Sequence, residues 1–136
     1  MKVFVDASLL IYLNVKMPDH EAKIIEDFWL ELLSNHSLYT NVLVLDEVIY
    51  ISWRKYSIPF EETIEFIDRA VLPYVDLIPI GSIEYLKARE IMIKQRLKPS
   101  DAIHLATIIV HGLNAIASED EDFDRTGIKR IWIREK

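Results

Sequence analysis

The stretch KVFVDAS, residues 2–8, decides the fold class because its character changes abruptly at Asp6. The β-branched and aromatic residues up to Val5 are typical of a short buried strand, and a polar residue then ends that strand. The next residues, ASLLIYLNVK, have the composition of a helix that stops near Pro18. The chain therefore begins with a strand that passes directly into a helix.

The same alternation of strand and helix continues along the whole chain. Further strands are expected at 37–40, 75–80, 113–118 and 128–133, and further helices at 20–34, 41–56, from 61 to about 71, 82–97 and 101–112. Asp19 and Ser100 are expected to cap two of these helices. Strands that alternate with helices need crossover connections, which produce a largely parallel sheet covered on both faces. The sequence predicts one domain, 1–136, that is a three-layer α/β/α sandwich with a mainly parallel sheet of four to five strands.

Composition narrows the class of protein. The 136 residues are 51% hydrophobic and 28% charged, a globular balance, and the absence of cysteine excludes disulfides and thiolate metal sites. The apolar start is cut short at Asp6, and the longest apolar stretch, 102–117, is too polar to span a membrane. We therefore expect a soluble, cytoplasmic protein. A formal net charge of −6 argues against non-specific nucleic-acid binding unless a local basic patch or bound cations assist it.

Acidic residues occupy the places where a parallel sheet binds its ligands, at the carboxyl ends of the strands. They are Asp6 after the first strand, Glu47 inside the most apolar helix, Asp101 at the start of a helix, and Asp120 and Asp122 after the fourth strand. Carboxylates that converge cannot all stay ionised without a counter-charge, which Mg²⁺ or Mn²⁺ supplies through its preference for oxygen ligands. Such a site suits phosphodiester hydrolysis, because the ion activates a bound water and stabilises charge on phosphoryl oxygens.

Each acid taken alone also has an ordinary structural explanation. Asp6 suits a helix cap, Asp101 complements a helix dipole, and the acidic run 119–124 suits a solvated loop. Within that run, Glu119, Glu121 and Asp124 are expected to point outward.

The acid in the most apolar helix is ambiguous from periodicity. Asp46 and Glu47 are adjacent, and helical spacing does not separate them as the buried acid. A salt bridge to Arg54 or Lys55 is the alternative to a role in a metal site.

Four short motifs occur in order along the chain: VDAS at 5–8, LDEVIYISWRK at 45–55, PSDAIHLAT at 99–107 and SEDEDFDRTGI at 118–128. In this order and spacing the sequence resembles the PIN domain over nearly all of its length. Within that family it most resembles the VapC group of toxin ribonucleases.

The resemblance implies a pocket of four acids that binds Mg²⁺ or Mn²⁺ and cleaves RNA. The catalytic positions fall on Asp6, Glu47 rather than Asp46, Asp101 and Asp120, with Asp122 as an extra acid beside the metal ligands Asp6, Asp101 and Asp120. Ser8 and Ser118 fall on supporting hydroxyl positions, and Phe123 on a core position.

The resemblance also implies biological partners. It predicts an RNA substrate, a small antitoxin protein of a type II toxin–antitoxin pair, and a homodimer. PIN domains also act in RNA processing and decay, which is one alternative, and a PIN-like binding module without catalysis is another. A receiver-like Mg²⁺-binding signalling module is a third, although it requires paired acids after the first strand, where VDAS has one.

Two further features near Asp101 have competing interpretations. Lys94, Arg96 and Lys98 either form a solvated helix end or a basic rim that guides RNA phosphates toward the acids. His104 lies on the same helical face as Asp101, and we expect a packed histidine there rather than a catalytic base.

Overall fold

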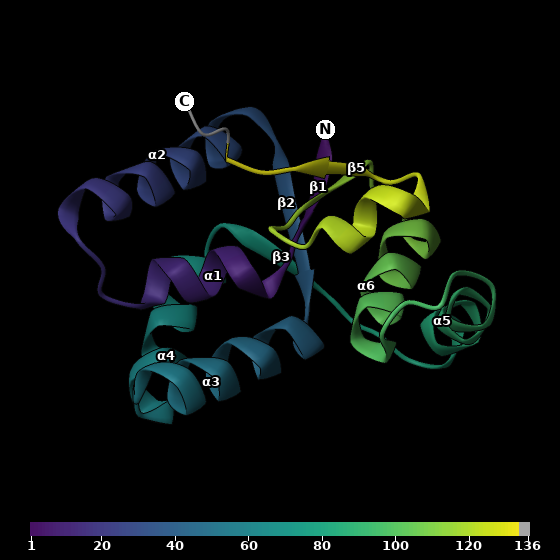
Figure 1. The fold of residues 1–136 in the computed structure, drawn as a ribbon, viewed down its shortest axis with the longest axis horizontal. Coiled ribbons are helices and arrows are strands. Elements are labelled where there is room, and N and C mark those ends of the chain that lie inside the picture. Colours follow the sequence, from purple (N-terminus) through teal and green to yellow (C-terminus); the bar gives the residue numbers. More distant parts are fainter. Residues whose placement is uncertain (134–136) are drawn as a thin grey trace.

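The computed structural model describes residues 1–133 of the chain. Its centre is a parallel sheet of five strands in the order β3-β2-β1-β4-β5 (Figure 1). The strands are β1 (Lys2–Val5), β2 (Ser37–Asn41), β3 (Val75–Ile78), β4 (Ala115–Ala117) and β5 (Lys129–Ile131). The predicted parallel α/β/α sandwich is therefore confirmed.

Helices connect the strands at the positions that the sequence pattern predicts. They are α1 (Ala7–Asn14), α2 (Asp19–Asn35), α3 (Val42–Tyr56), α4 (Phe60–Phe66), which continues as the π-helical turn η1 (Ile67–Val71), α5 (Ser82–Gln95) and α6 (Pro99–Val110). The acidic run forms a 3₁₀ helix, η2 (Glu121–Thr126), where the sequence suggested a loop. No helix among residues 1–133 is long and apolar enough to cross a membrane.

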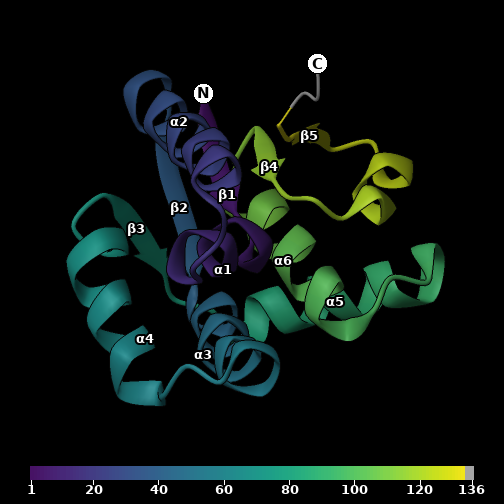
Figure 2. The same cartoon turned by 60° about the vertical axis from the view of Figure 1, so that its left-hand side comes forward.

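The direction of the crossovers sets the layers. The chain moves from β1 to β2 to β3 in one direction along the sheet and then returns to place β4 on the other side of β1. Because crossovers between parallel strands are right-handed, connections that run in opposite directions cover opposite faces. Accordingly, α1, α2, α3 and α4 lie on one side of the sheet, and α5 and α6 lie on the other (Figures 1 and 2).

The core lies between these layers. Val3, Phe4 and Val5 are fully buried, because a strand that is covered on both faces has no solvent side. On α2 the apolar stripe buries Trp29 and Leu32 against the sheet. The core is continuous through both faces of the sheet and gives the strand ends a rigid frame.

Two predicted helix caps are wrong. Pro18 is the N-cap of α2, with Asp19 already in the helix, and α6 begins at Pro99, so that Ser100 lies inside its first turn. Proline is favoured at the first helical position because its fixed φ matches the helix and its missing N–H needs no partner there. Pro99 takes this position in α6, which therefore begins two residues before the predicted start at 101. In α2 Pro18 is itself the N-cap, one residue before the predicted cap Asp19.

Candidate functional site

The site lies where the strand order reverses, between β1 and β4. Asp6 directly follows β1, and its backbone N–H donates to the carbonyl oxygen of Ala117, 3.0 Å away, at the end of β4. Crevices at such switch points, outside the carboxyl ends of parallel strands, are where α/β sheets bind ligands. The segment that follows β1 begins with Asp6, and the segment that follows β4 carries Asp120.

Asp6 serves as both a helix cap and a site acid. Its Oδ1 accepts the N–H of Ala7 at 2.8 Å as the N-cap of α1, and its Oδ2 accepts the hydroxyl of Ser118 at 2.7 Å. The side chain is buried, and burial raises the pKa of the Asp6 carboxyl above its usual value. Asp6 therefore caps α1, and the same side chain lines the candidate site.

Ser118 links the two sides of the switch point. Its hydroxyl donates to Asp6 and accepts the backbone N–H of Asp120 at 3.0 Å, and the side chain is fully buried. Ser8 plays a smaller part, because its hydroxyl accepts the backbone N–H of Glu119 at 3.2 Å. Both hydroxyls thus hold the turn after β4 against the start of α1.

Asp101, Asp120 and Asp122 form an all-carboxylate group. Each offers an oxygen that lies within 4.8 Å of the others. Asp101 is buried in the first turn of α6, and its Oδ2 has no hydrogen-bond partner among residues 1–133. Burial, followed by the negative charges of Asp120 and Asp6, raises the pKa of Asp101 to about 7. A buried acceptor with no donor is costly, and a bound cation would relieve that cost.

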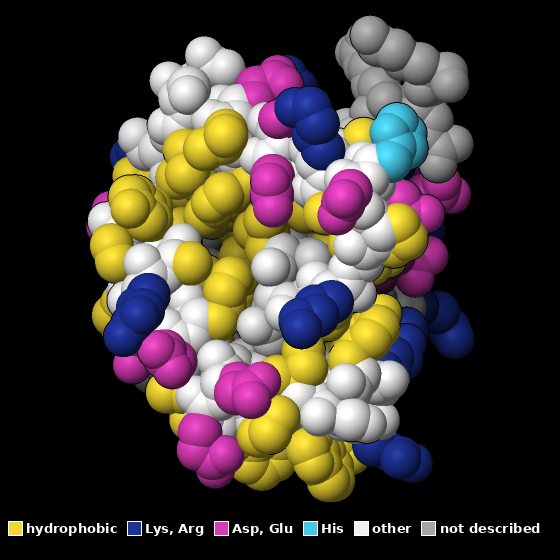
Figure 3. Space-filling model, turned by 90° about the vertical axis from the view of Figure 1, so that its left-hand side faces the viewer, with side chains coloured by type: hydrophobic (Ala, Val, Ile, Leu, Met, Phe, Trp, Pro, Cys, Tyr) yellow, Lys and Arg dark blue, Asp and Glu magenta, His cyan; other side chains and the backbone are white. Residues whose placement is uncertain are grey.

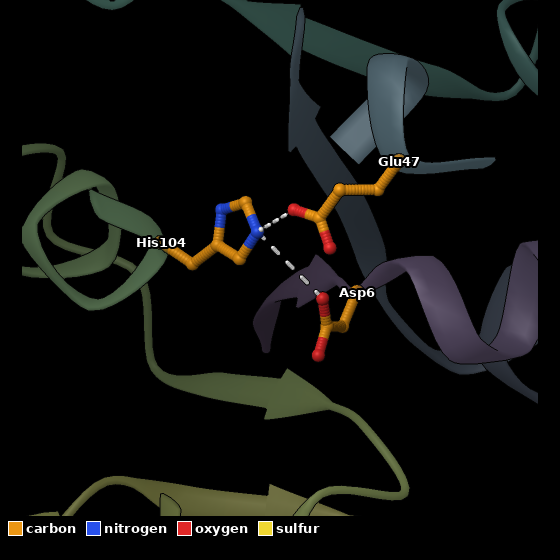
Figure 4. A group of neighbouring side chains, drawn as sticks. All are labelled: Asp6, Glu47 and His104. Carbon is orange, nitrogen blue, oxygen red and sulfur yellow. Dashed lines mark hydrogen bonds and ion pairs between the residues drawn. The ribbon is translucent and has the colours of Figure 1, made fainter. Parts of the chain in front are cut away.

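Glu47 reaches the site from α3 and contacts His104 on α6. The Nε2 atom of His104 lies 2.7 Å from Oε1 of Glu47 and 3.8 Å from Oδ1 of Asp6, and all three side chains converge (Figure 4). Asp46, the neighbour that periodicity could not separate from Glu47, is exposed. Glu47 forms its ion pair with His104 rather than with Arg54 or Lys55.

Most of these residues line a cavity of about 530 Å³, whereas the exposed Asp122 and the buried His104 are not on its wall. The predicted site residues on its wall are Asp6, Ser8, Glu47, Lys98, Asp101, Ser118 and Asp120. Glu119 and Glu121 also line it, and both remain exposed to solvent, as expected. The Glu119 carboxylate accepts the hydroxyl of Tyr12 at 2.6 Å.

Neighbouring predicted residues lie elsewhere. Lys94 pairs with Glu90 at 3.1 Å, and Arg96 is the C-cap of α5 in a left-handed conformation. Of the three bases before Asp101, Lys98 is therefore the one at the cavity wall. Asp124 points toward Arg130, with its Oδ1 2.8 Å from Nε of that side chain. Phe123 is fully buried, as expected.

A family model described as the PIN domain matches residues 3–129. The chain belongs to the PIN domain family. The match contains the β1 strand end, α3, the start of α6 and the turn after β4, and therefore every acid of the cavity.

Solved structures share this PIN fold at low sequence identity. VapC20 from Mycobacterium tuberculosis, described as a sarcin–ricin loop cleaving toxin, matches with a TM-score of 0.75 and 17% identity over 93% of this chain and 95% of that one. VapBC2 from Rickettsia felis, bound to a promoter DNA fragment, matches with a TM-score of 0.75 and 16% identity over 98% of this chain and 100% of that one. A toxin–antitoxin complex from Klebsiella pneumoniae matches with a TM-score of 0.68 and 23% identity over 98% of this chain and 99% of that one. A comparison with curated protein sequences gave no match.

The donor set of this PIN domain fits a hard divalent cation. Asp101, Asp120 and Asp122 offer only carboxylate oxygens, the ligands that Mg²⁺ and Mn²⁺ prefer. The unpaired Oδ2 of Asp101 and the raised pKa of its carboxyl are both relieved when a cation supplies the missing positive charge. These oxygens could hold a metal ion directly or through water.

Two residues behind Glu47 were not predicted as parts of the candidate site. Asn41 was given no role, and His104 was expected only to pack in the core. Asn41 ends β2, caps α3 and contacts His104, which in turn contacts Glu47. An asparagine between a predicted strand and a predicted helix is a recognisable N-cap signal, so the cap could have been found. Its contact with His104 joins β2 to α6 across 63 positions, and no local pattern reveals such a pair.

Proposed function

We propose that this PIN domain is a metal-dependent endoribonuclease, the toxin of a type II toxin–antitoxin pair acting in the cytoplasm. One observation carries the proposal: carboxylates from separate elements converge on one cavity at the carboxyl edge of the sheet, and one of their buried oxygens lacks a donor. A structural ion-pair network would have placed a base against Asp101, Asp120 and Asp122. Among residues 1–133, His104 instead pairs with Glu47, and Lys98 lies on an exposed position of the cavity wall.

The acids divide the work of binding and orientation in this proposal. Asp6, Asp101 and Asp120 hold Mg²⁺ or Mn²⁺, with Asp122 beside them, and Glu47 orients a water molecule. The bound ion supplies an activated water and charge neutralisation on the phosphate. Ser118 keeps Asp6 and the Asp120 turn in register, so that the oxygens are arranged before the ion arrives.

RNA is the proposed substrate. A chain with a net charge of −6 needs cations in order to approach the RNA phosphate backbone. The metal provides positive charge at the scissile phosphate, and Lys98 adds a cation at the rim. The structural neighbour VapC20 is described as cleaving the sarcin–ricin loop, which supports an RNA substrate for this fold.

A protein partner and a second copy of the chain belong to the same proposal. Hydrophobic side chains are exposed over much of the side of the molecule on which α2 and α4 lie (Figure 3). Around α3 and α4, the rings of Tyr50, Trp53 and Phe60 pack against one another while each remains 44–52% exposed. Exposed apolar groups of this size are typical of protein contacts. We propose that an antitoxin and a dimer partner cover such surfaces.

Cleavage of an RNA panel tests the activity. Purified protein is incubated with tRNA, rRNA and mRNA, with Mn²⁺ or with a chelator. We expect Mn²⁺-dependent cleavage that Asp6→Asn and Glu47→Gln abolish. Asp46→Asn is the matched control, because it removes an exposed acid next to Glu47 on α3 and should leave cleavage intact. Equal cleavage by wild type and Asp6→Asn would refute the site.

Isolation of the protein from its own cells tests the partner and the oligomer. We expect a small protein to copurify in stoichiometric amounts and to inhibit cleavage. After its removal, sedimentation should give twice the chain mass of 15.9 kDa. Active protein that is monomeric and has no inhibitory partner would favour the alternative of an RNA-processing nuclease.

A further inference from the structure

A line of buried polar side chains runs from the start of α3 to the candidate site. Asn41, His104 and Thr107 are each fully buried, and His104 ends the line by contacting Glu47 (Figure 4). The Asn41 amide nitrogen lies 3.3 Å from Nδ1 of His104 and 3.1 Å from Oγ1 of Thr107. Each contact has a direction of hydrogen donation, and together these directions fix where the histidine carries its hydrogen.

The helix cap fixes the orientation of the Asn41 amide. Its Oδ1 accepts the backbone N–H of Val44 at 3.0 Å, and an N–H can only donate. The amide nitrogen must therefore face His104 and Thr107. The Thr107 hydroxyl donates to the carbonyl oxygen of Ile103 at 2.8 Å, which leaves its oxygen as an acceptor for Asn41. Both hydrogens of the Asn41 amide are thus directed, one to Thr107 and one to Nδ1 of His104.

The ring of His104 must then accept at Nδ1 and donate at Nε2. A hydrogen on Nδ1 would face the amide hydrogen of Asn41 without an acceptor between them. We infer that Asn41, through its role as the cap of α3, locks His104 in the tautomer that carries hydrogen on Nε2, so that His104 positions the Glu47 carboxylate and does not bind metal. His104 is a positioning residue, and its effect on cleavage rests on the proposed nuclease function.

This inference separates two groups that both have the composition of a metal site. Asp6, Glu47 and His104 bring three potential ligand atoms within 4.8 Å, as do Asp101, Asp120 and Asp122. In the first group Nε2 has no lone pair to offer, because its hydrogen lies on the 2.7 Å contact to Oε1 of Glu47. The ring is also held in place by Phe4, whose centroid lies 5.3 Å away. His104 is therefore excluded as a ligand, and the ion site is built from carboxylates alone: Asp101, Asp120 and Asp122, with Asp6 from the first group.

Nitrogen NMR on the histidine rings tests the tautomer directly. Long-range ¹H–¹⁵N spectra of labelled protein are recorded metal-free and with saturating Mg²⁺, and His104 is assigned by its loss in His104→Gln. We expect a pyridine-like Nδ1 and a pyrrole-like Nε2 in both states. A hydrogen on Nδ1, two ring hydrogens, or an Nε2 signal that becomes pyridine-like with Mg²⁺ would overturn the inference.

Two substitutions at Asn41 separate capping from tautomer control. Asn41→Ser keeps an equally good cap but removes the donor to His104, and Asn41→Asp keeps the cap and places an acceptor there. We expect Asn41→Ser to mix the two tautomers and Asn41→Asp to place hydrogen on Nδ1. Both should lower kcat by about ten- to a hundredfold with KM for RNA little changed, as for other residues that orient a site.

The two readouts fail separately. If the wild-type rings give the expected spectrum but no RNA is cleaved, the proposed function fails and the tautomer assignment stands. If RNA is cleaved but both Asn41 variants keep the wild-type His104 spectrum, the tautomer lock fails alone. The Val44 amide signal and the melting temperature report whether each variant has kept the α3 cap, and the wild-type spectrum decides the inference even if one variant does not fold.

Discussion

Asp101 is a single residue whose buried carboxyl lowers the stability of the metal-free fold at neutral pH. Its pKa of about 7 in the folded protein lies well above the unfolded value of about 3.9. Between these two values the folded state binds more protons than the unfolded state. The free energy of unfolding therefore falls as pH rises from about 4 through about 7 in the absence of metal. Above that range the ionised carboxylate keeps a standing repulsion with Asp120 and Asp6.

Asp101→Asn should relieve this repulsion. We expect the metal-free variant to melt at a higher temperature than wild type at pH 8, with a flatter pH dependence between pH 4 and 7, while cleavage is lost. Thermal unfolding in a chelator across pH 4.5–8.5 measures the melting temperatures of the variant and of the wild type. Asp124→Asn is the control of opposite sign, because the hydrogen bond from Arg130 holds the pKa of Asp124 below its usual value. A variant at Asp101 that melts below wild type at every pH would contradict the assignment.

Ser118 is the second residue whose contacts predict a measurable effect. Ser118→Ala leaves the part-buried Asp120 N–H without its acceptor and the Oδ2 atom of Asp6 without its donor. We expect a loss of about 1–3 kcal/mol in the free energy of unfolding, and a Mn²⁺ affinity about ten- to a hundredfold weaker. Urea unfolding and calorimetric Mn²⁺ titration measure the two. Ser8→Ala should have a smaller effect, since Ser8 is only partly buried and water can replace its hydroxyl; equal effects would contradict the linking role of Ser118.

At the scale of elements, η2 depends on one buried ring. Phe123 is fully buried, and Arg125 ties the same short helix to the carbonyl oxygens of Gln95 and Arg96 at the end of α5. A 3₁₀ helix of this length has little stability of its own, so these contacts hold the segment that carries Asp122.

Phe123→Ala should therefore destabilise both the fold and the metal group. We expect a loss of about 3–5 kcal/mol in the free energy of unfolding, together with weaker Mn²⁺ binding because η2 is no longer anchored. Denaturant unfolding and Mn²⁺ titration below the new melting temperature measure the two. Phe123→Leu fills most of the same space, so it should lose less unfolding free energy and less Mn²⁺ affinity than Phe123→Ala. An alanine variant with wild-type Mn²⁺ affinity would show that η2 is held by other contacts.

The elements themselves could be predicted because each is specified locally. The β-branched run before Asp6 predicts a strand, and the helical spacing of apolar residues on α2 predicts a helix. Each signal lies within a short stretch of sequence. Helix starts were less predictable. Pro99 takes the first helical position of α6, which its fixed φ favours over a start capped by Ser100. In α2 the N-cap is Pro18 and Asp19 is already helical.

The candidate site was predictable only as far as topology reaches. Parallel strands bring Asp6 and Asp120 to one edge whatever the detailed packing is. The choice of Glu47 over Asp46 came from the family resemblance, since periodicity alone did not decide it. The bond between Glu47 and His104 depends on how α3 and α6 meet beyond the end of the sheet, and this is a tertiary fact with no local signal.

For the whole molecule, the topology explains why the acids cluster. Helices α1 to α4 leave β1 and β2 toward one face, and α5 and α6 return on the other face to β4. The strand ends between them form a crevice that both layers reach. The chain has a net charge of −6, and several of its carboxylates lie close enough to repel one another in this crevice. The acids could separate only if the core unfolded, so the fold itself holds them together.

Mn²⁺ should therefore stabilise the whole fold. An ion that binds the folded state alone adds about 2.7 kcal/mol at a hundred times its dissociation constant, which raises the melting temperature by several degrees. Because Asp101, with a pKa of about 7, must lose its proton to become a full ligand, the affinity and the shift should increase from pH 6 to pH 8. Thermal unfolding across a Mn²⁺ titration at several pH values measures this, with NaCl of equal ionic strength as the control for screening. Asp101→Asn should show neither the shift nor its pH dependence. A flat melting temperature for wild type would mean that the carboxylates are neutralised by protons and by each other's hydrogen bonds, and not by metal.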